Sequence, residues 1–270
     1  MTGINRILAV CNDFDKCGEV LHKTAELAKK HDAGVTLMFV HEHELFELPI
    51  FSEEVAVDIQ KIREELLEKV KSAGIDEAAI FIYENDTAVR VALEVEKEHD
   101  TLVLTHYVED ITFDLVQKVK RPVLVLKAEE HTYEKAVIAL DAALPQKCLT
   151  FMHRYFEGVE LHLYQDFQFV PIPAVDPVVE PLDVGMDATL YTELLEAKRE
   201  AFEVFCKEQG LKGTFEIGEG SIDEDTLAFA KKEQVDLLVL APLDLDTLLG
   251  DAVNDILEKA DIDVLVYPGG

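Results

Sequence analysis

Three histidines stand where they could form a metal site. His41 and His43 follow one apolar run and His106 ends another, while Asn12 and Asp13 follow a third. Neutral imidazole nitrogen and carboxylate oxygen are the usual ligands of zinc and of other divalent cations. In open α/β sheets, ligands bind beyond the carboxyl ends of the strands, so these side chains could converge there. The alternative is a set of separate, solvated histidines, since polar side chains are expected at strand exits.

The sequence carries none of the motifs that define common catalytic or cofactor sites. It contains no GxSxG elbow, no HExxH, no GxxxxGK(S/T) loop and no GxGxxG fingerprint. Gly218-Glu219-Gly220 lacks the third glycine, so we expect a plain strand-to-helix connection with Ser221 or Asp223 as the helix cap. The carboxylates show no spacing that singles out an acid/base pair and are typical of a solvated face. We therefore expect no enzymatic activity and no cofactor.

The charge of the chain limits its partners. Its 270 residues include 55 Asp and Glu against 25 Lys and Arg, which gives a formal net charge of −30. Such a field repels the phosphates of nucleic acids and anionic lipid headgroups, so we expect neither nucleic acid nor a membrane as a partner. The acidity serves either solubility or a binding surface for a protein or small molecule.

The location and the thiol state follow from what the sequence lacks. The chain passes from Met1 directly into an apolar strand pattern without a signal peptide, and it has no apolar stretch of about 18 residues. These features predict a soluble, cytoplasmic protein. The four cysteines, Cys11, Cys17, Cys148 and Cys206, form no CxxC pair, and we expect reduced thiols.

Four runs of the first half recur in the same order in the second half. The pairs are residues 6–12 and 135–141, 34–40 and 158–164, 99–104 and 235–240, and 122–126 and 263–267. In the first pair, each run has a basic residue, five apolar residues and a short polar residue. The repeat predicts two domains, residues 1–128 and 133–270, with an acidic, polar linker at 128–133.

The matched runs also predict the fold class. They are short, continuous and rich in β-branched residues and leucine, as in parallel strands buried on both faces. Amphipathic helical patterns lie between them, for example the stripe of Ile59, Ile62, Leu66 and Val70. We therefore expect an α/β protein with two doubly wound, parallel, five-stranded sheets, packed as separate sheets about a pseudo-twofold axis in a monomer or a homodimer.

One segment of the second half has no counterpart in the first. Residues 165–188 contain four prolines among apolar residues. A segment of this length is too long for an ordinary connection between two elements. We expect either a lid or a contact surface, or a loop that packs on its own domain or on the sister domain.

The four landmarks, in their order and spacing, resemble those of the universal stress protein family, and the two repeats cover nearly the whole chain. The resemblance implies the adenine nucleotide alpha hydrolase-like fold. It also implies an adenine contact from an aspartate at the end of the first strand, and phosphate binding by a loop with two glycines followed by Gly-Ser or Gly-Thr. Asp141 matches that aspartate, whereas the first half has Asn12-Asp13 there.

The phosphate loop departs from the family pattern in both halves. No glycine lies between Leu104 and Arg121 in the first half, and Gly250-Asp251 replaces Gly-Ser in the second. A fixed carboxylate at a helix N-terminus competes with phosphate. Asp141, Gly250 and Asp251 are therefore predicted to be a degenerate nucleotide site that does not bind ATP.

These patterns lead to one leading hypothesis and two alternatives. The leading hypothesis is a cytoplasmic stress-response protein without enzymatic activity, which binds a partner protein or a small ligand at the cleft between the domains and at the segment 167–179. One alternative is a divergent adenine-nucleotide-binding protein with its pocket at Asp141 and Gly250. The other is a metal-binding protein that uses His41, His43 and His106.

Overall fold

The chain forms two consecutive α/β units. The computed structural model describes residues 4–42, 53–129, 131–140, 145–168, 188–218, 220–242 and 248–268. The elements of the first half are β1 (Arg6–Cys11), α1 (Cys17–His31), β2 (Gly34–His41), α2 (Glu53–Ser72), β3 (Ala78–Glu84), α3 (Thr87–Val95), β4 (Thr101–His106), α4 (Ile111–Lys118) and β5 (Val123–Leu126). Those of the second half are β6 (Lys135–Leu140), α5 (Gln146–Tyr155), β7 (Glu160–Phe167), α6 (Ala188–Gln209), β8 (Lys212–Ile217), α7 (Ile222–Glu233), β9 (Leu237–Ala241), α8 (Leu248–Lys259) and β10 (Asp263–Val266).

The two halves have the same strand order. The strands of the first half are arranged β3-β2-β1-β4-β5 and those of the second β8-β7-β6-β9-β10, with parallel pairing inside each half. The order reverses at β1 and at β6, as in a doubly wound sheet. The α/β fold predicted from the sequence is therefore confirmed.

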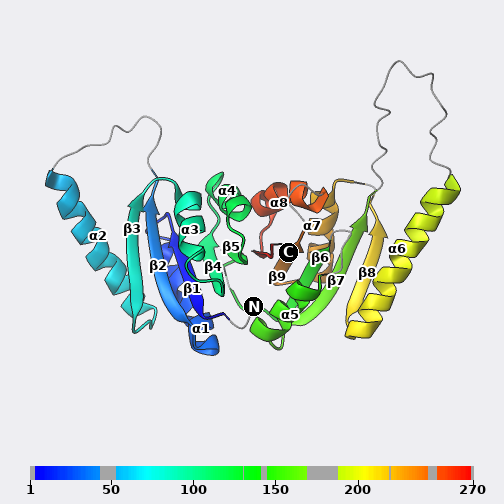
Figure 1. Ribbon diagram of the computed structural model, residues 1–270, viewed down its shortest axis with the longest axis horizontal. Coiled ribbons are helices and arrows are strands. Elements are labelled where there is room, and N and C mark those ends of the chain that lie inside the picture. The colour runs from blue at the N-terminus through cyan, green and yellow to red at the C-terminus, as the bar shows by residue number, and fades with distance from the viewer. Residues whose placement is uncertain are drawn as a thin grey trace, which may run out of the picture.

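The prediction of two separate sheets is wrong. β5 and β10 pair antiparallel and join the halves into one sheet with ten strands in the described part of the chain (Figure 1). Leu124 faces Leu265 in this pair, and the valines on either side pair reciprocally. This register places a local twofold axis between the two leucines, because equivalent residues exchange partners. An apolar edge strand is a liability when it is exposed, and here each half covers the other's edge.

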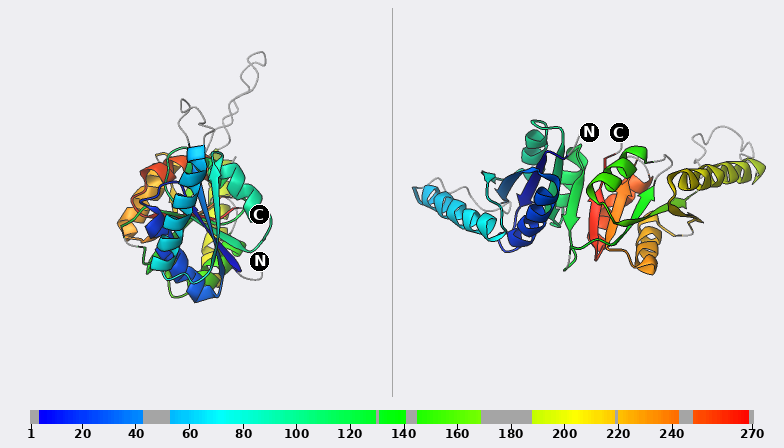
Figure 2. Two further views of the ribbon diagram at one scale, coloured as in Figure 1. Left: turned by 90° about the vertical axis from the view of Figure 1, so that its left-hand side faces the viewer. Right: turned by 90° about the horizontal axis from the view of Figure 1, so that it is seen from below.

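Helices cover both faces of the sheet (Figure 2). The central strands are buried on both sides: Ile7 and Ala9 belong to a core cluster that includes residues of α1, α2, α5 and α6, while Leu8 and Val10 belong to a second cluster that includes residues of α3, α4, α7 and α8. This double burial explains why the strands appear in the sequence as continuous apolar runs. No described helix is long and apolar enough to cross a membrane.

At the junction, α4 contacts α8 on one face of the sheet, and α1 meets α5 on the other. The long helices α2 and α6 lie at the two outer ends (Figure 1). The proline-rich segment expected at 165–188 begins in β7, and its residues 169–187 lie outside the described part of the chain.

Candidate functional site

The carboxyl ends of β1, β2 and β4 form the candidate site of the first half. β1 lies between the other two strands and ends at Cys11. Asn12 and Asp13 follow it, while β2 ends at His41 and β4 at His106. The parallel direction of these strands brings their polar exits to one edge, where α/β proteins bind ligands.

Internal hydrogen bonds occupy one side of this edge. The Asn12 amide nitrogen donates to the Val40 carbonyl at 3.0 Å and to the Thr87 hydroxyl at 2.7 Å. The Glu42 carboxylate accepts from the backbone N–H of Thr87 at 2.8 Å and from its hydroxyl at 2.5 Å. Thr87 begins α3, so a fixed carboxylate already satisfies a donor at this helix N-terminus.

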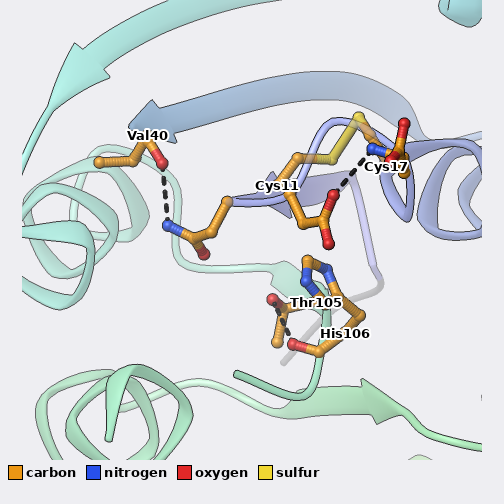
Figure 3. Close-up of a disulfide and its surroundings, with 8 residues drawn as sticks. Cys11, Cys17, Val40, Thr105 and His106 are labelled. Atoms are coloured by element: carbon orange, nitrogen blue, oxygen red, sulfur yellow. Dashed lines mark hydrogen bonds between the residues drawn. A yellow bond between two sulfur atoms is a disulfide. The ribbon is translucent and has the colours of Figure 1, made fainter. Parts of the chain in front are cut away.

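A disulfide occupies the other side. Cys11 at the end of β1 is bonded to Cys17 at the start of α1, with their Cα atoms 5.3 Å apart (Figure 3). Both cysteines are fully buried. The prediction of reduced thiols is therefore wrong for this pair, while Cys148 and Cys206 are free, as expected, and are also buried. The signal that sequence reasoning missed is that Cys11 and Cys17 bracket one strand-to-helix turn.

His106 lies beside Cys11 in the sheet, because the preceding residue, Thr105, pairs with Val10 of β1 (Figure 3). Its side chain is buried, and its Nδ1 has no hydrogen-bond partner in the described part of the chain. Burial lowers the pKa of His106 and Lys16 lowers it further, against the opposing effect of Asp13 and Glu19. The imidazole is therefore neutral at pH 7.

Two of the three predicted metal ligands, His41 and His106, lie on strands that are separated by β1. His41 is exposed at the end of β2, whereas His106 is buried at the end of β4, on the far side of β1. His43 lies outside the described residues, so the three-histidine site stays a prediction. Within the described ranges, no group of three His, Cys, Asp or Glu side chains could hold a metal ion.

The connection between β4 and α4 is short and acidic. It consists of residues 107–110, which contain Glu109 and Asp110 but no glycine. The amide of Val108 donates to the Thr112 hydroxyl at 2.8 Å, and the amide of Thr112 donates to the Val108 carbonyl at 2.9 Å. Burial raises the pKa of Tyr107, and the nearby carboxylates of Glu258, Glu109 and Asp110 add to this effect. The connection therefore presents negative charge and internally bonded amides where a nucleotide-binding relative would cradle phosphate.

The predicted nucleotide residues of the second half are only partly described. Asp141 and residues 243–247 lie outside the described part of the chain. Gly250 lies in the first turn of α8, and the neighbouring Asp251 is described only as part of that helix. The degenerate site at Asp141, Gly250 and Asp251 therefore stays a prediction.

Carboxylates also gather at the ends of β7 and β8. The Asp166 side chain accepts from the Gln168 amide at 2.9 Å, and Asp225 accepts from the backbone N–H of Gly220 at 3.2 Å. Burial raises the pKa of Asp166, and Asp225 and Glu216 add to this against the Gln168 hydrogen bond. Charge repulsion at this edge opposes an anionic ligand.

The glycine-rich connection between β8 and α7 is a strand-to-helix turn, as far as its described residues, 218, 220 and 221, show. Ser221 stands at the N-cap position of α7, but its side chain makes no capping hydrogen bond. Asp223 pairs instead with the Lys259 ammonium at 2.6 Å. The residue proposed as an alternative cap thus ties α7 to α8.

The architecture and its described strand edges define a class: a tandem, doubly wound α/β protein with acidic edges. Residues 158–268 match the family model of the universal stress protein family. This match lies within the second half of the chain, and the first half repeats the same strand order.

Solved structures support the fold of the whole chain. A universal stress protein from Archaeoglobus fulgidus aligns with a TM-score of 0.67 and 16% identity, over 99% of this chain and 97% of that chain. A functionally unknown protein from Pseudomonas aeruginosa aligns with a TM-score of 0.63 and 18% identity, over 97% and 92%. The comparison with curated proteins finds no match.

Proposed function

We propose that this chain is a cytoplasmic stress-response protein of the universal stress protein type that does not bind ATP and has no enzymatic activity. It acts by binding a small ligand or a partner protein. The match of residues 158–268 to the universal stress protein family supports the stress-response class. The chemistry of the strand edges supports independence from ATP.

The connection between β4 and α4 is the observation that carries this proposal. A triphosphate needs unpaired backbone N–H groups and an uncrowded, flexible loop. Here the amides of Val108 and Thr112 are bonded within the turn, and Glu109 and Asp110 supply negative charge. A phosphate would have to displace internal hydrogen bonds and approach like charges.

Titration calorimetry with Mg-ATP tests the proposal. We expect no saturable heat, because the described connection between β4 and α4 offers no phosphate cradle and Asp251 is predicted to compete with phosphate in the second half. A dissociation constant below about 100 μM, or more than roughly 5 kcal/mol of binding free energy, would contradict it. Asp251→Ser serves as the matched variant, and it should stay inactive because one substitution restores neither the glycines nor the charge of the loop.

The Cys11–Cys17 disulfide favours a second candidate function, a thiol switch. Cytosolic thiols are normally kept reduced, and cytosolic disulfides are usually transient and redox-sensing. Hydrogen peroxide would oxidise the two thiols: the S–S bond forms, the O–O bond breaks, and the two thiol protons leave with the peroxide oxygens as two water molecules. His106, neutral and with an unused ring nitrogen, lies beside Cys11 in the sheet.

Alkylation of thiols under denaturing conditions, directly after cell lysis, followed by mass spectrometry, tests the switch. We expect Cys11 and Cys17 to be alkylated in samples from unstressed cells and protected as a disulfide after exposure to peroxide. Cys148 and Cys206 are internal controls, because both are free and should be alkylated under both conditions. A pair that is joined in both conditions, or reduced in both, would rule out the switch.

A further inference from the structure

A basic pocket lies at the junction of the two halves, away from the strand edges described above. It has a volume of about 630 Å³. Its walls come from the segment before β5, from α5 and from the end of β10. This volume is within the roughly 300–1,000 Å³ range of small-molecule sites.

The charge of the pocket is opposite to that of the chain. Its lining includes five basic side chains, His99, Lys120, Arg121, Lys147 and Arg154. None of the described residues that line it is acidic, although the chain as a whole has 55 acidic residues and only 25 Lys and Arg. A group of positive charges that persists in so acidic a chain points to an anionic ligand.

The Arg121 guanidinium is held in place at the pocket wall. One terminal nitrogen lies 2.6 Å from His99 Nδ1, and the other donates to the Lys120 carbonyl at 2.7 Å. Its Nε is buried and has no partner in the described part of the chain. Each terminal nitrogen of a guanidinium carries two N–H groups, so a guanidinium held in this way still has donors for a carboxylate or a similar oxyanion.

The remaining wall is aromatic. The Phe151 ring lies 4.9 Å from the Tyr155 ring and 5.3 Å from the Tyr267 ring, measured between centroids. The Arg154 guanidinium lies 5.6 Å from the centre of the Tyr155 ring. Such a wall favours a flat, apolar body on the ligand, and the basic residues favour its acidic end.

The twofold-related surface shows what kind of group fits. There, beside α1 and the start of β10, the linker places the Tyr133 ring against Lys23, whose Nζ is 4.3 Å from the ring centre. Lys23 corresponds to Phe151 in the pocket wall, because the buried faces of α1 and α5 align: Leu21 and Thr24 match Leu149 and Met152. On this side of the junction, the Tyr133 ring of the chain itself thus occupies the position that corresponds to the pocket.

We propose that the pocket at the junction binds a small organic anion with an aromatic body, with Arg121, Lys147 and Arg154 on its acidic group and Phe151, Tyr155 and Tyr267 against its ring. This inference rests on the proposed ligand-binding function and deepens it by naming the site and the class of ligand. It does not depend on the absence of ATP binding.

A fluorescence titration with 8-anilinonaphthalene-1-sulfonate tests this site, because the dye combines a sulfonate with aromatic rings. We expect one dye molecule per chain and at least tenfold weaker binding for Arg121→Gln and for Lys147→Gln. Lys207→Gln on the exposed face of α6 is the matched control and should bind as the wild type does. The uncharged N-phenyl-1-naphthylamine should bind more weakly and show no difference among the variants.

Two outcomes would overturn the proposal. One is the absence of saturable dye binding, and the other is binding that the Arg121 and Lys147 substitutions leave unchanged. Lys147 is exposed, so its variant keeps the test valid if Arg121→Gln does not fold. A failed dye titration would contradict the pocket proposal but not the proposal that the chain does not bind ATP. Conversely, ATP binding detected by calorimetry would contradict the second proposal but not the first.

Discussion

The two sides of the β5–β10 junction differ, although a local twofold axis relates them. On the side of α1, the linker fills the space: the Tyr133 hydroxyl donates to Asp263 at 2.7 Å, and His131 lies 2.7 Å from the same carboxylate. On the side of α5, the corresponding space is the basic pocket. The comparison shows that a duplicated fold can keep its backbone while its two equivalent surfaces take different roles.

One pair of equivalent residues accounts for much of this difference. Asp263 begins β10, and Pro122 occupies the matching position before β5. Asp263 is fully buried and also accepts from the backbone N–H groups of Lys127 and Ala128, at 2.7 and 2.9 Å. Proline has no such acceptor, so nothing fastens a covering segment to the equivalent site.

Among the changes that test this difference between the two sides, removal of the Asp263 carboxylate should lower the free energy of unfolding most. Asp263→Ala leaves two backbone donors, a hydroxyl and an imidazole without their acceptor, and we expect a loss of about 3 kcal/mol in the free energy of unfolding. Urea denaturation measures the change. Asp261→Ala is the matched control, because Asp261 is exposed and two residues away, and it should change stability by less than about 0.5 kcal/mol. Equal losses in both variants would mean that Asp263 does not fasten the linker.

A smaller effect should appear in the pH dependence of stability. Burial acts to raise the pKa of Asp263, but hydrogen bonds from His131, the Lys127 amide, Tyr133 and the Ala128 amide outweigh it and lower the pKa. A carboxyl group whose folded pKa is lowered stabilises the protein above its unfolded pKa of about 3.9 and loses that contribution as the pH falls through the folded value.

The free-energy gap between the wild type and Asp263→Asn should therefore stay constant from about pH 7 to pH 5 and shrink below about pH 4. Urea denaturation at a series of pH values measures it. A gap that widens on acidification would show that burial, and not hydrogen bonding, controls this carboxyl group.

Much of the fold could be predicted from the sequence because its signals are local. The run at 122–126 and its repeat at 263–267 indicated equivalent strands, and both are strands in the structure. Their pairing with each other was missed, because an apolar edge strand does not specify which edge will cover it. The polar exits of β1, β2 and β4 were placed correctly at one edge of the sheet, since strand direction fixes that edge.

The contents of the site were harder to predict. Cys11 and Cys17 lack the CxxC spacing, and only the turn between β1 and α1 brings their Cα atoms to 5.3 Å. The basic pocket escaped notice for a related reason. Its residues come from separate segments near 99, 120, 150 and 267, none of which is basic enough to stand out in a chain of net charge −30.

The sequence by itself determined the repeat, the α/β class and the lack of a glycine-rich phosphate loop in the first half, because each depends on residue types at short spacing. Only the tertiary structure decided that one sheet joins the halves, that the linker occupies one side of the junction, and that the other side is a basic pocket. These features depend on residues more than 100 positions apart, such as Tyr133 and Asp263, which share a hydrogen bond, or Arg121 and Tyr267, which line one pocket. Such arrangements exist only once the chain has packed.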